Sequence, residues 1–174
     1  LESAGIPATD RRVARLHQRY VRRLIRNLRE PIGERCPGVE RAVREVALRA
    51  EVGLLTGNWK EGARAKLAGF GLDGLFEGCI GAYGGDGMRR DDLVPVAVRR
   101  AQRRWGEVQR VVVIGDTVAD VACARAGDRV LPNVDVVAVA VSTGFAPDEH
   151  LVAAQPDLLL PDLDQGLSDL LALL

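Results

Sequence analysis

The sequence of 174 residues lacks the features that would place it at once among membrane or nucleic-acid-binding proteins. No apolar run is long enough to cross a bilayer. The formal net charge is zero, so the molecule has no overall field that would recruit nucleic acid or a membrane surface. We therefore expect neither a nucleic-acid partner nor a membrane partner.

Cysteine is scarce as well. Cys36, Cys79 and Cys123 are an odd number of cysteines, and their spacing matches no pattern of metal ligands. We expect them to be reduced, small apolar residues, as is typical of a cytoplasmic protein. Hydrophobic residues, in contrast, make up 47% of the chain, which excludes a disordered protein and suffices for the core of one domain with a small appendage.

The most informative stretch begins with Val111–Ile114, a continuous β-branched run that predicts a strand buried on both faces. Gly115 breaks this strand and delivers Asp116 and Asp120 to its carboxyl end, where open α/β sheets bind ligands. We expect a helix from Asp120 that stops at Gly127. Two acids four residues apart suit a hard cation such as Mg²⁺. The alternative is that Asp116 only caps the helix and Asp120 lies on a solvated face.

A second candidate site follows the predicted strand 52–55. The Thr56 hydroxyl and the amides of Gly57 and Asn58 lie where the next helix begins, which is a favourable place for an anion. A plain strand-to-helix turn would use the same residues.

A third candidate is the pair Arg89 and Arg90, which precedes the predicted helix 91–104. A cation at this point would neutralise a phosphate. Both arginines would be equally compatible with a solvated position.

Strands and helices alternate along the chain. This order predicts an α/β, Rossmann-like, three-layer fold, in which a parallel sheet has helices on both faces. The expected strands are residues 52–55, 79–83, 111–114, 134–141 and 157–160, and the expected helices are residues 9–30, 39–50, 61–68, 91–104, 120–126, 147–154 and 166–174.

The first expected helix, which Thr9 or Asp10 would cap, is amphipathic. Its apolar stripe needs a partner, yet no second long helix precedes it; the stripe comprises Val13, Leu16, Tyr20, Leu24 and Leu28. Its opposite face carries Arg11, Arg12, Arg15, Arg19, Arg22, Arg23, Arg26 and Arg29. Because Tyr20 is the only stacking side chain among these arginines, a solvated face is favoured over a nucleic-acid-binding one.

The order of the three candidate segments resembles the haloacid dehalogenase superfamily of phosphatases, and most of all its phosphoglycolate phosphatase-like branch with a helical cap. Leu54-Leu-Thr-Gly-Asn58 is similar to the second motif of that family, whose Thr and backbone amides bind the phosphoryl group. Arg90 lies where the third motif has its Lys or Arg, with Arg89 and Lys66 as alternatives. Gly115-Asp-Thr-Val-Ala-Asp120 is similar to the fourth motif, whose acids hold Mg²⁺.

The resemblance extends from about Gly38 to the end of the sequence. It divides the chain into a remnant of a helical cap, residues 1–34, and an α/β core, residues 35–174.

The first motif of the family, Asp-x-Asp-x-Thr or Val, is not found in the N-terminal part of the chain, so no nucleophile is assigned. Asp162 and Asp164 have the motif's spacing, but Gly166 stands where Thr or Val belongs, and they follow the fourth motif. We expect that the family's N-terminal segment is missing. Its strand would lie between those that end in Thr56 and Asp116, so two strand edges would be unpaired and the chain poorly stable alone.

The resemblance implies a Mg²⁺-dependent phosphatase of small phosphate esters that acts through an aspartyl-phosphate intermediate. Its partner would be a small phosphorylated metabolite such as phosphoglycolate. Thr56, Gly57, Asn58 and Arg90 would bind the phosphoryl group, while Asp116 and Asp120 would hold the metal. The alternatives are a receiver-like signalling module and a non-catalytic module that binds phosphate or metal.

Overall fold

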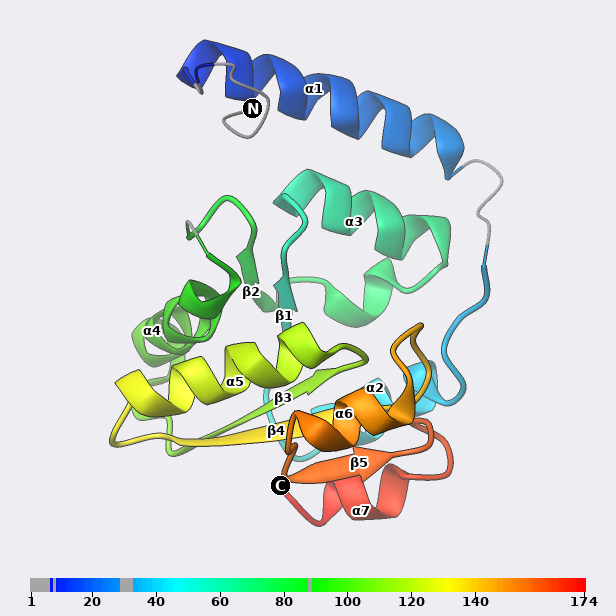
Figure 1. Cartoon of the computed structure of the whole chain (residues 1–174), viewed down its shortest axis with the longest axis vertical. Helices are drawn as coiled ribbons and strands as arrows, with labels where there is room; N and C mark the ends of the chain where they lie inside the picture. Colours follow the sequence, from blue (N-terminus) through cyan, green and yellow to red (C-terminus); the bar gives the residue numbers. More distant parts are fainter. Residues whose placement is uncertain (1–6, 8, 29–32, 88) are drawn as a thin grey trace.

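The structure of the protein is a computed structural model that describes residues 7, 9–28, 33–87 and 89–174 (Figure 1). The strands are β1 (Gly53–Thr56), β2 (Ile80–Tyr83), β3 (Arg110–Gly115), β4 (Asp135–Val141) and β5 (Leu158–Leu160). The α-helices are α1 (Asp10–Asn27), α2 (Val39–Ala47), α3 (Lys60–Gly69), α4 (Leu93–Trp105), α5 (Val118–Val130), α6 (Asp148–Ala153) and α7 (Leu167–Leu171). Two short 3₁₀ helices are η2 (Asp73–Phe76) and η3 (Arg90–Asp92).

All strand pairs are parallel, but they form two separate sheets. β1 pairs with β2, and β3, β4 and β5 follow one another in the second sheet, where β4 is central. In the part of the chain that the structure describes, no hydrogen-bonded ladder joins β1 to β3. The sheet is therefore divided between the strands that end in Thr56 and Gly115.

Helices cover both faces of the larger sheet because the side chains of β4 alternate. Val136, Ala138 and Ala140 pack into a core with residues of α4 and α5, while the intervening valines pack with residues of α2 and α7. A strand whose side chains are buried on both faces of the sheet is typical of a parallel sheet enclosed by crossover helices. The predicted α/β, Rossmann-like architecture is confirmed.

Two details around β3 differ from the sequence prediction. Ile114 is 41% exposed instead of buried, because it lies on the strand that borders the division between the sheets. Helix α5 does not stop at Gly127 but continues to Val130. Gly127 serves packing instead, since a Cβ at this position would lie 2.5 Å from Val94 Cγ1 of α4.

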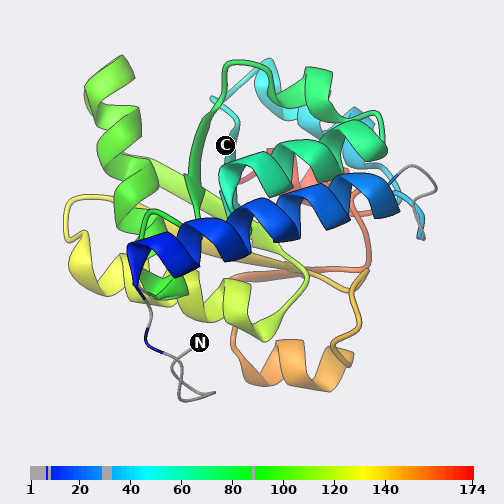
Figure 2. The same ribbon diagram turned by 90° about the horizontal axis from the view of Figure 1, so that it is seen from above.

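Helix α1 lies along α3, as Figures 1 and 2 show from two directions. The apolar stripe of α1 therefore has a partner that the sequence did not reveal. Tyr20 and Leu24 face Gly62 of α3, where a Cβ would lie 3.2 Å from Tyr20 Cε1 and 3.5 Å from Leu24 Cδ2. Leu28 faces Gly69 in the same way. These small residues of α3 let the two helices approach closely.

Helix α3 covers the apolar stripe of α1 only in part, since Val13 and Leu16 stay 37% and 47% exposed. All arginines of the described part of α1 are exposed, in agreement with a solvated face: Arg11, Arg12, Arg15, Arg19, Arg22, Arg23 and Arg26. Arg29 and the expected end of the helix up to Glu30 lie outside the described residues. Across the described residues, no helix has the length and apolar character needed to span a membrane.

Candidate functional site

The predicted phosphate-binding turn follows β1 directly. The Thr56 hydroxyl oxygen accepts hydrogen bonds from Asn58 N at 3.2 Å and from Asn58 Nδ2 at 2.8 Å. Tyr20 of α1 donates its hydroxyl hydrogen to Asn58 Oδ1 at 3.2 Å, which fixes the orientation of the carboxamide. Because Thr56 Oγ1 accepts from Asn58, its own proton is directed elsewhere and is available to an anion.

The fourth-motif acids follow β3. Thr117 is the N-cap of α5, and Asp120 completes a capping box by accepting from Thr117 N at 3.1 Å and from Thr117 Oγ1 at 2.6 Å. Asp120 is only 7% exposed. The alternative interpretation is therefore wrong on both counts, since Asp116 is not the cap and Asp120 is not solvated. Gly115 leaves room for this arrangement, because a Cβ there would overlap the Asp120 carboxyl group.

Arg90 brings the two turns together. Its Nη2 forms an ion pair with Asp120 Oδ1, and its Nη1 lies 3.8 Å from the position that a Cβ on Gly57 would occupy. Within the described residues, its buried Nε has no hydrogen-bond partner. A buried donor of this kind needs an acceptor, and an anion between the two turns would supply one.

The other two candidate cations lie away from this point. Arg89 is 77% exposed on its side chain and pairs with Asp91 at 3.2 Å. Lys66 is an exposed residue of α3. Of the three cations, Arg90 is the one whose guanidinium lies against both Gly57 and Asp120.

Asp116 lies beside the loop that follows β4, where a Cβ on Gly144 would lie 2.5 Å from Asp116 Oδ2. In the described part of the chain, its carboxylate has no hydrogen bond and no ion pair. No group of three or more His, Cys, Asp or Glu residues that could hold a metal occurs among the described residues. Asp116 is thus the acid of this site with open coordination capacity, whereas both Asp120 oxygens are already bonded.

A sequence model of the haloacid dehalogenase-like hydrolase family matches residues 3–125, which is more than half of the chain. The chain belongs to this family. A solved haloacid dehalogenase-like hydrolase from Streptococcus pneumoniae is similar in fold, with a TM-score of 0.59 and 18% sequence identity. The similarity covers 79% of this chain but only 58% of that protein's chain. No curated protein sequence matches this chain.

Asp162, which has the spacing expected for the first motif, does not lie at the candidate site. Asp162 Oδ1 accepts from Asp164 N at 2.8 Å and from Gln165 N at 2.7 Å, so the carboxylate caps its own turn. This turn follows β5, and β4 separates β5 from β3. The Asp162 and Asp164 pair therefore belongs to the outer edge of the sheet and not to the candidate site.

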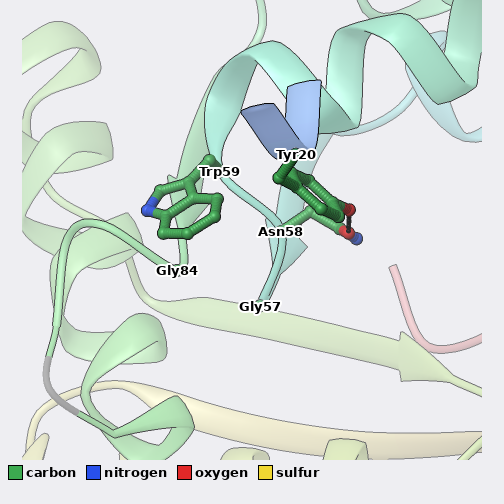
Figure 3. A pocket seen from close by; sticks show the side chains of 5 residues that line it. All are labelled: Tyr20, Gly57, Asn58, Trp59 and Gly84. Atoms are coloured by element: carbon green, nitrogen blue, oxygen red, sulfur yellow. Dashed lines mark hydrogen bonds between the residues drawn. The ribbon is translucent and has the colours of Figure 1, made fainter. Parts of the chain in front are cut away.

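A pocket of about 310 Å³ opens beside the predicted phosphate-binding turn (Figure 3). It is lined by Tyr20, Gly57, Asn58, Trp59 and Gly84. The rings of Tyr20 and Trp59 meet edge to face, with 5.6 Å between their centroids. Sequence reasoning missed this pocket because it assigned Tyr20 to the apolar stripe of a helix and gave Trp59 no role. Trp59 directly after the second motif was the available signal.

Proposed function

We propose that this chain forms the phosphoryl-binding and metal-binding part of a Mg²⁺-dependent phosphatase of small phosphate esters, with an aspartyl-phosphate intermediate. The observation that carries this proposal is the position of Arg90, which contacts both predicted turns and has a buried Nε without a partner among the described residues. Membership of the haloacid dehalogenase-like hydrolase family supports a hydrolase. The nucleophilic aspartate is not among the residues of this site.

The proposed roles follow from the donors at the site. The Thr56 hydroxyl, the Gly57 amide and the Arg90 guanidinium would bind the equatorial phosphoryl oxygens, over which negative charge is spread. The Asn58 amide already donates to Thr56 Oγ1 and would join them only by sharing its hydrogen between the two acceptors. Tyr20 would act through Asn58 by fixing the carboxamide that directs the Thr56 hydroxyl.

The residues present fit Mg²⁺, which commonly binds proteins through one or two carboxylates together with phosphate oxygens and water. Asp116 would be a direct ligand, and Asp120 would hold a ligand water or orient Arg90. When bound, the metal would neutralise charge on the transferring phosphoryl group.

The test is a calorimetric titration of the chain with inorganic phosphate. Arg90→Gln removes the positive charge between the two turns and is expected to weaken phosphate binding by about tenfold or more, the equivalent of one charge-assisted hydrogen bond. Arg89→Gln is the matched control, because it removes an exposed neighbouring arginine and is expected to change the affinity less than twofold.

Equal effects of the two substitutions, or no phosphate binding by the unmodified chain, would contradict the proposal. If Lys66→Gln weakened phosphate binding and Arg90→Gln did not, the third-motif role would belong to Lys66 of α3.

A non-catalytic module that binds phosphate and metal is the second candidate. The small number of acids at the site favours it, since no group of three potential metal ligands occurs in the described part of the chain. Hydrolysis of p-nitrophenyl phosphate in the presence of Mg²⁺ separates the two functions, because a binding module gives no turnover.

A further inference from the structure

The pocket between α1 and the phosphate-binding turn is lined by glycine main chain and by uncharged side chains. Gly84 packs directly on the main chain of Gly57, since a Cβ on Gly84 would overlap the Gly57 carbonyl oxygen, and the side chains of the lining are two aromatic rings and one carboxamide. Its volume of about 310 Å³ is at the lower end of the range for small-molecule sites. The pocket therefore has room for a group as large as one aromatic ring.

None of the five lining residues carries a charge. Of the charged side chains beside the lining residues, Arg90 lies near Gly57, pairs with Asp120 and is assigned to the phosphoryl group, and two others are engaged elsewhere. Lys60 directs its Nζ to the face of the Tyr83 ring, 5.9 Å from the centroid, and Glu61 lies 3.2 Å from His17 Nε2. Because Arg90 is assigned to the phosphoryl group, a further charged group in the pocket would lose hydration without gaining an ion pair of its own, which disfavours a carboxylate on the alcohol part.

The aromatic wall is held in place by its own contacts. The Trp59 ring also meets His17, at 4.6 Å between centroids, and Tyr20 is fixed by its hydrogen bond to Asn58. Rigid aromatic side chains lose little conformational entropy when a flat ligand packs on them. Offset or edge contacts between rings add stabilisation beyond burial alone.

We infer that this pocket receives the alcohol part of the phosphate ester and selects a neutral group with a flat apolar face, such as an aryl ring. The inference rests on the proposed function, because Gly57 and Asn58 belong to both the phosphate-binding turn and the pocket. It identifies Tyr20 and Trp59 as specificity-determining residues and disfavours phosphoglycolate, whose leaving group carries a carboxylate.

The experiment compares the affinities of the chain for inorganic phosphate, phenyl phosphate and phosphoglycolate by calorimetry. Phenyl phosphate is expected to bind about tenfold more tightly than phosphate, and phosphoglycolate no more tightly than phosphate. Trp59→Leu is expected to remove the preference for phenyl phosphate while phosphate affinity stays within about twofold. Trp105→Leu, at the end of α4, is the matched control and is expected to keep the preference.

A second readout uses the unmodified protein and does not depend on the folding of a variant. In ¹H–¹⁵N spectra, the indole signal of Trp59 is expected to shift with phenyl phosphate and that of Trp105 to stay unchanged. Phosphate binding without a preference for phenyl phosphate, or without a Trp59 shift, would overturn this inference alone. Absence of phosphate binding would overturn it together with the proposed function.

Discussion

At the scale of single residues, the candidate site depends on hydrogen bonds that direct one hydroxyl group. Thr56 Oγ1 accepts twice from Asn58, and Asn58 in turn accepts from Tyr20. This chain of bonds connects α1 to the predicted phosphate-binding turn. The hydroxyl proton of Thr56 is thereby left for an anion, which supports the proposed role of this residue in phosphate binding.

Thr56→Val should therefore weaken the binding of inorganic phosphate by about tenfold, because one hydrogen bond to a charged group is lost. Thr56→Ser retains the hydroxyl and should stay within about threefold of the unmodified chain, since the bonds from Asn58 can still form. Calorimetric titration of both variants checks this. Equal affinities of the two variants would show that the hydroxyl has no part in binding.

The residues of the three turns were accessible from the sequence, because each motif is local and its strand or helix follows from hydrophobic pattern and capping chemistry. The choice of Arg90 over Arg89 rested on the resemblance to the third motif alone. Both have the same charge and neighbouring positions, and only the fold places one guanidinium beside Gly57 and Asp120 while the other pairs with Asp91. The roles in phosphate and metal binding stay predictions.

At the scale of elements, the loop after β2 is fastened to α4 by a carboxylate. Asp86 accepts from Arg100 Nη1 at 2.6 Å, from Arg100 Nη2 at 2.7 Å and from Tyr83 N at 2.8 Å. The hydrogen bonds from Arg100 hold the pKa of Asp86 below its usual range, although burial of the carboxylate acts in the opposite direction. The carboxylate is therefore favoured in the folded state.

A lowered folded-state pKa contributes stability above the pKa of the unfolded chain, and this contribution is lost as the pH falls through the folded-state value. Asp86→Asn should cost about 1 kcal/mol of unfolding free energy at pH 7, a discounted figure because the side chain of Arg100 is 39% exposed. The difference should shrink below about pH 4. Urea unfolding at several pH values measures it, and a difference independent of pH would contradict the assigned cause.

The elements themselves were largely predictable, with boundaries shifted by one to a few residues. The failures have a common origin in contacts between distant segments. Helix α5 continues through Gly127 because Val94 of α4 packs onto that glycine, and the partner of α1 is a later helix with small residues at the contact. Neither contact has a local signature in the sequence.

At the scale of the whole molecule, the division of the sheet is the dominant feature. Among the described residues, β1 and β3 each have one hydrogen-bonded neighbour, whereas β4 has two. Helix α4 packs on β1 and β2, α5 packs on β3 and β4, and the contact of Gly127 with Val94 joins these two helices. In the part of the chain that the structure describes, the two sheets are thus held together through helices and not through a backbone ladder.

The division predicts uneven protection of the backbone. Amides of β4 should exchange with deuterium slowest, and those of β1 should exchange at least about tenfold faster, because a short strand with one neighbour opens by local fluctuation. Hydrogen exchange followed by mass spectrometry measures both segments in one sample. Equal protection of β1 and β4 would mean that the two sheets open as one cooperative unit.

The most direct test of the account is the coupling between Mg²⁺ and phosphate, measured as the affinity of the chain for inorganic phosphate with and without the metal. If Asp116 and Arg90 hold a metal and a phosphate side by side, Mg²⁺ should raise phosphate affinity by about fivefold or more, and Asp116→Asn should abolish this gain. The same phosphate affinity with and without Mg²⁺ in the unmodified chain would contradict the account.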